Sequence, residues 1–186
     1  VAPTLDLQGT EQILDACAAP GGKSMYMAAL MDNTGSLMSC DIHEHKIALM
    51  ESNAQRLGIS IVQTKVQDAT ELPSAWKSYF DRVLVDVPCS GLGILQKKLD
   101  MRWRKDESTL SELPPLQLAI LERAAMTVKE KGYLVYSTCT LNYKENEDVV
   151  EAFLQKHKEF SIVPVGTDFP LKSNNGMITT YPPTDD

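Results

Sequence analysis

The sequence predicts an α/β fold of the Rossmann-like type, with a mainly parallel sheet and helices on both faces. Short apolar runs typical of buried strands alternate with amphipathic segments of helical length along most of the chain. A glycine-containing turn, residues 18–22, directly follows the first apolar run. Acidic side chains lie at or near the ends of several runs, and open α/β sheets bind ligands beyond the carboxyl ends of their strands.

The first part of the chain predicts strands that alternate with helices. The strands cover residues 12–17, 36–41 and 59–66. A first helix follows the glycine turn, from Lys23 to Met31. A second helix ends before Gly58, and its apolar face consists of Ile47, Met50, Ala54 and Leu57.

The rest of the chain continues the alternation. Further strands are predicted at residues 80–87, 133–139 and 160–165. A long helix between the first two of these ends near Gly132, and its apolar face consists of Leu116, Ile120, Ala124 and Val128. Residues 147–157 predict a last amphipathic helix. This alternation is typical of a parallel sheet that is covered on both faces.

Length and composition indicate one soluble domain. The chain has 186 residues, of which 43% are hydrophobic, and no apolar run approaches the ~20 residues of a membrane helix. We therefore expect a cytoplasmic protein without a membrane partner. The net charge of −7 argues against a broad nucleic-acid-binding surface, because such binding depends on Lys and Arg. One basic segment, Gln96–Lys105 with Trp103, is either a local RNA-binding patch or a solvated loop.

Cys89 and Cys139 each come where a predicted strand gives way to a loop, in Asp86-Val-Pro-Cys89 and in Ser137-Thr-Cys139-Thr. Such a pair has four possible interpretations: a nucleophile with an assisting group, a metal site, a disulfide, or two core thiols. The cysteines and histidines are scattered, without the close ligand pairs of a zinc site, so we expect no metal. We see no signal peptide and expect reduced cytosolic thiols, although the sequence leaves a disulfide open.

The turn after the first strand predicts a nucleoside cofactor. The segment Cys17–Ser24 departs from the phosphate-binding pattern G-x-x-x-x-G-K-[ST], because Cys17 replaces the first glycine and Pro20 lacks an N–H donor. It also lacks the dinucleotide fingerprint G-x-G-x-x-G. Asp41, about 20 residues further on, is placed to bind ribose hydroxyls. S-adenosylmethionine, a cation without a phosphate chain, suits a strand edge that carries several acids: Asp15, Asp41, Asp68 and Asp86.

Three motifs together resemble the Nol/Nop/Sun family of RNA cytosine-5 methyltransferases. They are Asp15-Ala-Cys-Ala-Ala-Pro-Gly-Gly-Lys23, Asp81-Arg-Val-Leu-Val-Asp-Val-Pro-Cys-Ser-Gly91, and Tyr136-Ser-Thr-Cys-Thr140 with Glu145-Asn-Glu147. The resemblance spans nearly the whole chain in the family's motif order, and it is closest to the bacterial Sun/Fmu branch. It implies a class I S-adenosylmethionine-dependent fold and an RNA substrate, 16S ribosomal RNA for that branch.

The resemblance also implies roles for individual residues. Cys139 of the Thr-Cys motif would be the nucleophile, and Cys89 would assist product release. Lys23 would lie close to the catalytic centre, and Asp86 would contact both the target cytosine and the cofactor. Asp41 would hold the ribose and Asp68 would lie near the adenine. The cofactor loop would consist of Cys17, Ala18, Ala19, Pro20, Gly21, Gly22 and Lys23.

The sequence departs from the family pattern at Leu99, where relatives have a proline in the basic loop. We interpret residues 1–186 as the methyltransferase catalytic domain, without the amino-terminal RNA-binding domain and the last antiparallel strand of Sun/Fmu proteins. Three alternatives remain: a DNA cytosine-5 methyltransferase that uses the Pro-Cys cysteine, a non-catalytic RNA-binding or ribosome-assembly factor, and a nicotinamide dehydrogenase.

Overall fold

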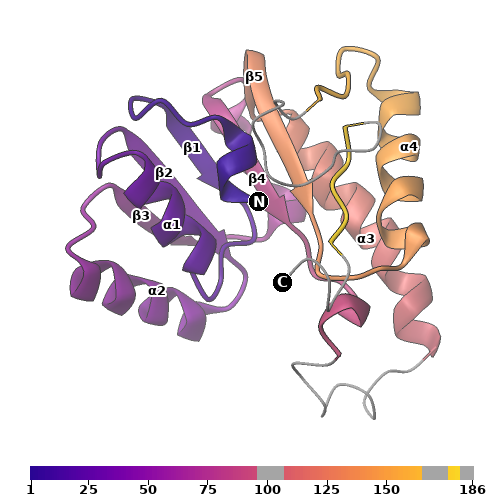
Figure 1. The fold of residues 1–186 in the computed structure, drawn as a ribbon, viewed down its shortest axis with the longest axis horizontal. Coiled ribbons are helices and arrows are strands. Elements are labelled where there is room, and N and C mark those ends of the chain that lie inside the picture. Colours follow the sequence, from indigo (N-terminus) through magenta and orange to yellow (C-terminus); the bar gives the residue numbers. More distant parts are fainter. Residues whose placement is uncertain (96–106, 165–175, 181–186) are drawn as a thin grey trace. The chain divides into compact units, whose positions relative to one another are not determined.

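The computed structural model describes residues 1–95, 107–164 and 176–180, and the whole basic segment Gln96–Lys105 lies outside these ranges. The chain forms two compact units. The first consists of Val1–Pro88 with Ala119–Ser137, and the second of Cys89–Leu118 with Thr138–Asp186. Figure 1 labels the helices and strands of both units and colours them in the order of the chain.

The first unit contains a sheet of five parallel strands in the order β3-β2-β1-β4-β5. This confirms the predicted α/β, Rossmann-like fold. The strands are β1 (Gln12–Asp15), β2 (Ser36–Asp41), β3 (Val62–Val66), β4 (Phe80–Asp86) and β5 (Val128–Ser137).

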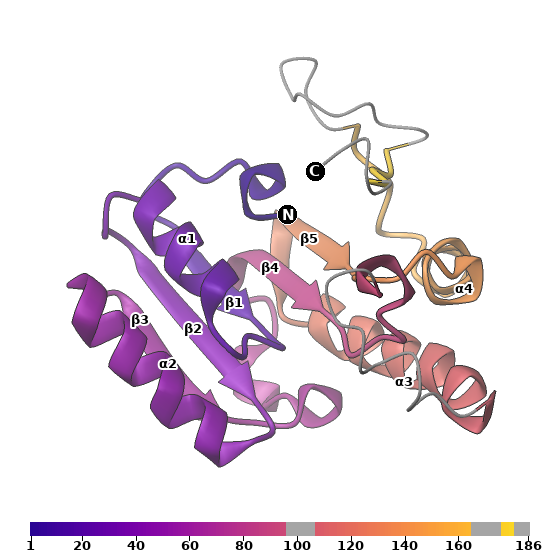
Figure 2. The same cartoon turned by 60° about the horizontal axis from the view of Figure 1, so that its bottom comes forward.

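Helices cover the sheet because parallel neighbours need crossover connections, which are almost always right-handed. Helix α1 (Gly22–Leu30) and helix α2 (Glu44–Leu57) both step outward from β1 toward β3, so handedness places them on the same face. Both contact β2 and β3 (Figures 1 and 2). The connection from β4 to β5 steps the other way and places the end of helix α3 (Glu107–Ala125) on the opposite face.

The core of the first unit lies mainly between α1 and the central strands. Ile13 of β1, Leu37 of β2 and Leu84 of β4 are fully buried in one cluster with Met27 and Met31. The opposite faces of these strands are buried as well, as Leu14 and Val83 show. A sheet buried on both faces explains why the sequence reads as continuous apolar runs.

The boundary between α3 and β5 corrects one prediction. The helix ends at Ala125 and β5 already begins at Val128, so the predicted helical face through Val128 and its end near Gly132 are wrong. Val128 pairs with Phe80 while Tyr133 pairs with Arg82, so extra residues bulge from β5 between them. Lys131 has φ 64°, and a Cβ on Gly132 would lie 2.8 Å from the carbonyl oxygen of Asp81. The glycine therefore allows a close strand approach and does not cap a helix.

The second unit contains the amino-terminal part of α3, two short 3-10 helices and helix α4 (Glu147–Lys156), which confirms the last predicted helix. The short helices are η4 (Leu92–Ile94) and η6 (Tyr143–Glu145). Phe160 packs edge-on against Phe153 at 5.3 Å between ring centroids, so the chain turns back onto α4. The predicted strand is wrong over residues 160–164, which are not strand, and Val165 lies outside the described residues.

In the part of the chain that the structure describes, no helix has the length and hydropathy that a membrane crossing requires.

Candidate functional site

The carboxyl edge of the sheet has a topological switch point at β1. The chain steps from β1 to β2 on one side, whereas β4 flanks β1 on the other side. Open α/β sheets bind ligands outside such a point, because the loops leave it in opposite directions. The loop after β1 carries Cys17 to Lys23 and the end of β4 carries Asp86, so the fold places these predicted site residues at the expected edge.

Backbone hydrogen bonds and a steric restriction hold the predicted cofactor loop. Ala18 N donates to Cys40 O at 2.7 Å, and Gly21 N donates to Ala18 O at 2.7 Å. Gly21 has φ 98°, and a Cβ there would lie 2.8 Å from Cγ of Met50 in α2. A glycine is therefore required where the loop turns into α1. In the same loop, the Ala19–Pro20 peptide bond is cis.

Cys17 is a neutral thiol in this loop. Burial raises its pKa, and the nearby carboxylates of Asp15 and Asp41 raise it further. A thiol in these surroundings is a poor nucleophile, because only the thiolate attacks. Cys17 therefore fits a structural position in the cofactor loop, to which the family motif assigns it.

A buried polar chain lies beneath the loop. Ser24 Oγ donates to Asp15 Oδ2 at 2.7 Å, and Ser39 Oγ donates to Ser24 Oγ at 2.9 Å. All three side chains are fully buried. Burial raises the pKa of Asp15 from 3.8 to about 7, against the hydrogen bond from Ser24, which lowers it. From the sequence, Asp15 is a candidate and Ser24 is named only as the end of the Cys17–Ser24 segment, while Ser39 is not singled out. The two serines lie on α1 and β2 and meet Asp15 only in the fold.

The raised pKa of Asp15 predicts a pH-dependent stability. Since folding raises this pKa from 3.8 to about 7, the native state holds a proton that the unfolded chain releases, and stability falls as pH rises between these values. Relative to Asp15→Asn, the wild-type free energy of unfolding should fall by up to about 1.4 kcal/mol per pH unit in this window. Urea unfolding of both proteins at several pH values measures the difference. Parallel stability curves would contradict a buried, titrating Asp15.

Asp41 and Asp68 both make local hydrogen bonds. Asp41 Oδ1 accepts from His43 N at 3.0 Å, just before α2. Asp68 Oδ1 accepts from Thr70 N at 2.8 Å and from Thr70 Oγ1 at 2.7 Å, and so caps a 3-10 helix. Asp at a strand end often acts in this way. These bonds orient each carboxylate, while their predicted roles at ribose and adenine stay predictions.

Asp86 is held by two side chains in the first unit. Lys23 Nζ donates to Asp86 Oδ2 at 2.6 Å, and Ser137 Oγ donates to Asp86 Oδ1 at 2.6 Å. The ion pair brings Lys23 and Asp86 together, while their predicted catalytic roles stay predictions. Sequence reasoning missed Ser137, although it belongs to the Ser-Thr-Cys-Thr motif and stands opposite Asp86 in the β4–β5 register. Both carboxylate oxygens are thus oriented, as a positioned acid or hydrogen-bond partner requires.

The second unit brings the two predicted catalytic cysteines together. Sγ of Cys89 and Sγ of Cys139 lie 3.2 Å apart, and Cys139 N donates to Cys89 Sγ at 3.2 Å. All four cysteines of the chain are free thiols in the described residues, so this pair is not a disulfide. Within the same residues, no group of three or more His, Cys, Asp or Glu side chains is arranged to hold a metal ion.

The two thiols differ in environment. The hydrogen bond with Cys139 and then burial raise the pKa of Cys89 well above its ordinary value. Cys89 is half-buried, whereas Cys139 is exposed. The pair therefore consists of a protonated thiol and an accessible sulfur next to it, which suits one acid–base group and one nucleophile.

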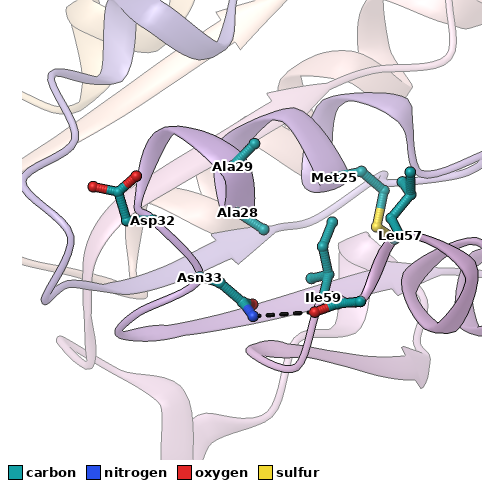
Figure 3. A pocket seen from close by; sticks show the side chains of 8 residues that line it. Met25, Ala28, Ala29, Asp32, Asn33, Leu57 and Ile59 are labelled. Carbon is teal, nitrogen blue, oxygen red and sulfur yellow. Dashed lines mark hydrogen bonds between the residues drawn. The ribbon is translucent and has the colours of Figure 1, made fainter.

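A separate pocket of the first unit has a volume of about 310 Å³ (Figure 3). Asn33 Nδ2 donates to Gly58 O at 3.2 Å along its edge. Its lining comes from α1 with the turn that follows and from the end of α2: Met25, Ala28, Ala29, Asp32, Asn33, Leu57, Gly58 and Ile59. The part of the lining that comes from α1 lies mainly toward the carboxyl end of that helix, whereas the cofactor loop adjoins its amino end. We assign the pocket no part in the candidate site.

The strand order with a glycine turn after β1 is Rossmann-like, and methyltransferases among the similar solved structures place the fold in the class I S-adenosylmethionine-dependent type. A solved structure described as a methyltransferase homolog protein from Pyrococcus horikoshii superposes with a TM-score of 0.76 at 29% identity, covering 96% of this chain and 56% of that one. A family model described as 16S rRNA methyltransferase RsmB/F matches residues 2–186, and the chain belongs to this family. The resemblance drawn from the motifs is thereby confirmed.

Two further relatives bear on the proposals below. A probable ribosomal RNA small subunit methyltransferase B from Bacillus subtilis is 46% identical over 161 residues, which are 86% of this chain and 36% of that protein. The structure of NSun6 from Pyrococcus horikoshii with SFG has a TM-score of 0.83 at 30% identity, covering 95% of this chain and 44% of that one. The chain thus spans less than half of the length of either relative.

Proposed function

We propose that this protein transfers a methyl group from S-adenosylmethionine to carbon 5 of a cytosine in RNA, with 16S ribosomal RNA as the substrate. The reaction proceeds through a covalent bond between Cys139 and the cytosine. The observation that carries this proposal is the geometry of the two thiols: their sulfur atoms lie 3.2 Å apart without a disulfide bond, Cys139 is exposed, and Cys89 is half-buried with a raised pKa. The family and the names of the relatives support RNA as the substrate class.

The residues of the first unit fit the cofactor. The loop from Cys17 to Lys23 has no room for a side chain at Gly21, and the acids Asp41 and Asp68 stand at neighbouring strand ends. NSun6 was crystallised with SFG, an S-adenosylmethionine analogue, which supports the same cofactor here. Bound S-adenosylmethionine supplies an electrophilic methyl group on a positively charged sulfur. Asp41 would hold the ribose of the cofactor and Asp68 would lie near its adenine, while Asp86 would contact the cofactor with a carboxylate that favours its positive charge.

A thiolate makes the poorly nucleophilic carbon 5 reactive. Addition of Cys139 Sγ to carbon 6 of the cytosine makes carbon 5 enamine-like, so that it accepts the methyl group. The two sulfur atoms lie 3.2 Å apart and either can be the donor. When Cys139 is a thiolate the Cys89 thiol is the donor, and its hydrogen bond favours the negative charge on Cys139. The target base leaves its stack to reach the thiol, as in other enzymes that modify bases.

Two more groups complete the cycle. Asp86, oriented by Lys23 and Ser137, acts as acid or hydrogen-bond partner at the cytosine ring nitrogen while the adduct forms. After methyl transfer the proton on carbon 5 leaves, and the bond from Cys139 to carbon 6 breaks. Once Cys139 Sγ is bonded to carbon 6 it is no longer a charged acceptor, so the main cause of the raised Cys89 pKa is removed and Cys89 releases its proton to solvent. The Cys89 thiolate then takes the carbon 5 proton, directly or through a water molecule, the carbon 5–carbon 6 double bond re-forms, and Cys139 leaves as a thiolate.

Trapping with 5-fluorocytosine RNA tests this function, since fluorine at carbon 5 cannot leave as a proton and the adduct persists. The chain is tested alone and completed with the remaining region of the Bacillus subtilis relative, of which it covers 36%. With S-adenosylmethionine present, wild type and Cys89→Ala should give a covalent complex on a denaturing gel, and Cys139→Ala should give none.

Other outcomes identify the competing functions. A complex lost only in Cys89→Ala would make Cys89 the nucleophile, as in DNA cytosine-5 methyltransferases. Absence of any complex in a protein that binds S-adenosylmethionine would contradict the covalent mechanism. A protein that binds RNA but not S-adenosylmethionine would be a non-catalytic RNA-binding factor.

A further inference from the structure

Glu145 is a fully buried carboxylate in the second unit and the first residue of the Glu-Asn-Glu motif. A buried carboxylate is costly unless hydrogen bonds stabilise its charge. Burial raises the pKa of Glu145, but hydrogen bonds from Ser90, Asn142 and Gln117 outweigh it, and the net pKa lies below the usual value. Glu145 is therefore ionised at neutral pH inside the protein, although the mechanism above gives it no role.

Each donor to this carboxylate comes from a different segment. Ser90 N donates to Oε2 at 2.8 Å, and Gln117 Nε2 from α3 donates to Oε2 at 3.0 Å. Asn142 Nδ2 donates to Oε1 at 2.9 Å. Ser90 immediately follows Cys89 in the chain, so one of these bonds fixes the backbone beside that thiol.

The bonds close into a ring that also includes the residue after Cys139. The hydroxyl groups of Ser90 and Thr140 are hydrogen-bonded at 2.7 Å, and Asn142 N donates to Thr140 Oγ1 at 3.2 Å. Asn142 returns to Glu145 through its side chain. We call Glu145, Ser90, Thr140 and Asn142 the carboxylate ring. It joins the Pro-Cys loop to the Thr-Cys loop through residues that adjoin both cysteines.

We propose that Glu145 is a positioning residue that holds the two thiols at hydrogen-bonding distance through the carboxylate ring. This rests on the proposed function, since the ring matters for catalysis only if Cys139 and Cys89 are the reacting pair. A small shift of either loop breaks the sulfur–sulfur contact, because Ser90 and Thr140 are direct chain neighbours of the cysteines. Misplacement by about 1 Å can cost on the order of 10²-fold in rate.

The test measures the thiols directly, without RNA or S-adenosylmethionine. The rate at which iodoacetamide alkylates Cys139 is followed by mass spectrometry across a pH series, for wild type, Glu145→Gln and Asp148→Asn. Glu145→Gln keeps the shape of the side chain but replaces one carboxylate oxygen with an amide N–H₂, which faces the N–H donors of the ring and cannot accept from them. Its Cys139 should react about tenfold more slowly at pH 7, with the rate profile moved to higher pH. Asp148, exposed in the first turn of α4, is the matched control and should leave the profile unchanged.

A second pair of variants leaves the buried charge in place: one variant breaks the ring and the other is its control. Thr140→Val keeps the shape of the side chain but removes the hydroxyl that bonds Ser90 and Asn142, whereas Thr140→Ser retains it. Thr140→Val should reproduce the slowed alkylation and Thr140→Ser should restore the wild-type profile. This pair decides the question if Glu145→Gln does not fold.

Two results separate this inference from the proposed function. If folded Glu145→Gln and Thr140→Val proteins keep the wild-type alkylation profile, Glu145 does not position the thiols, whatever the RNA experiment shows. If the profiles shift as expected but 5-fluorocytosine RNA is not trapped, the ring positions the thiols and the proposed reaction is wrong.

Discussion

The Cys89→Ala protein is expected to accumulate a covalent complex with unmodified RNA in the presence of S-adenosylmethionine, while its steady-state methylation rate falls by about 10³-fold or more. Cys139 still adds to the base and the methyl group is still transferred. The adduct then persists, because the group that assists loss of the carbon 5 proton, 3.2 Å from Cys139 Sγ in the wild type, is missing. A denaturing gel shows the complex, and tritium release from carbon 5 measures the turnover.

The matched control for this experiment is Cys40→Ala. Cys40 is a fully buried thiol of β2 that belongs to neither the thiol pair nor the proposed cofactor loop. Its variant should turn over at a rate close to wild type and show no persistent complex, provided that urea unfolding shows a folded protein. Normal turnover by Cys89→Ala would remove Cys89 from the mechanism.

Asp86→Asn is expected to lower the methylation rate by about 10²–10⁴-fold, the range typical of a lost general acid or base. The amide cannot give a proton to the cytosine ring nitrogen, and it leaves Lys23 without the carboxylate that it meets at 2.6 Å. Single-turnover methylation, with S-adenosylmethionine binding measured separately by calorimetry, distinguishes loss of chemistry from loss of cofactor.

The same strand provides a control for the loss of an ion pair. Asp81, near the start of β4, pairs with Lys129 at 2.8 Å, and its side chain is 30% exposed compared with 29% for Asp86. Asp81→Asn therefore removes an equivalent partly exposed pair away from the carboxyl edge. We expect its methylation rate to stay within a few-fold of wild type. Equal losses in both variants would indicate a structural effect and contradict a chemical role for Asp86.

Much of the fold follows from local patterns in the sequence. The apolar runs of β1, β2 and β4 stand where they were predicted, because strands buried on both faces have a composition that hardly depends on context. The end of α3, in contrast, does not lie where it was predicted. A basic residue followed by a glycine is typical of a helix end, but here Lys129 pairs with Asp81 and Gly132 packs on the Asp81 carbonyl. These contacts cross more than 45 residues and leave no local signal.

The candidate site, like the fold, has features that the sequence predicts and features that depend on tertiary contacts. The amino-acid sequence by itself determined which side chains stand at strand ends: the loop after β1, Asp86 after β4, and a cysteine beyond each of β4 and β5. Chain order and strand periodicity are sufficient for that, because parallel strands bring their carboxyl ends to one edge.

Only the tertiary structure decided which of these groups are paired and charged. The bond from Ser137 to Asp86 spans 51 residues, and the bond from Ser90 to Glu145 spans 55. Both depend on strand register and loop packing, which no short motif encodes. The same packing half-buries Cys89 against Cys139 and raises the pKa of Cys89, while Cys139 stays exposed, so two thiols with the same intrinsic chemistry acquire different surroundings.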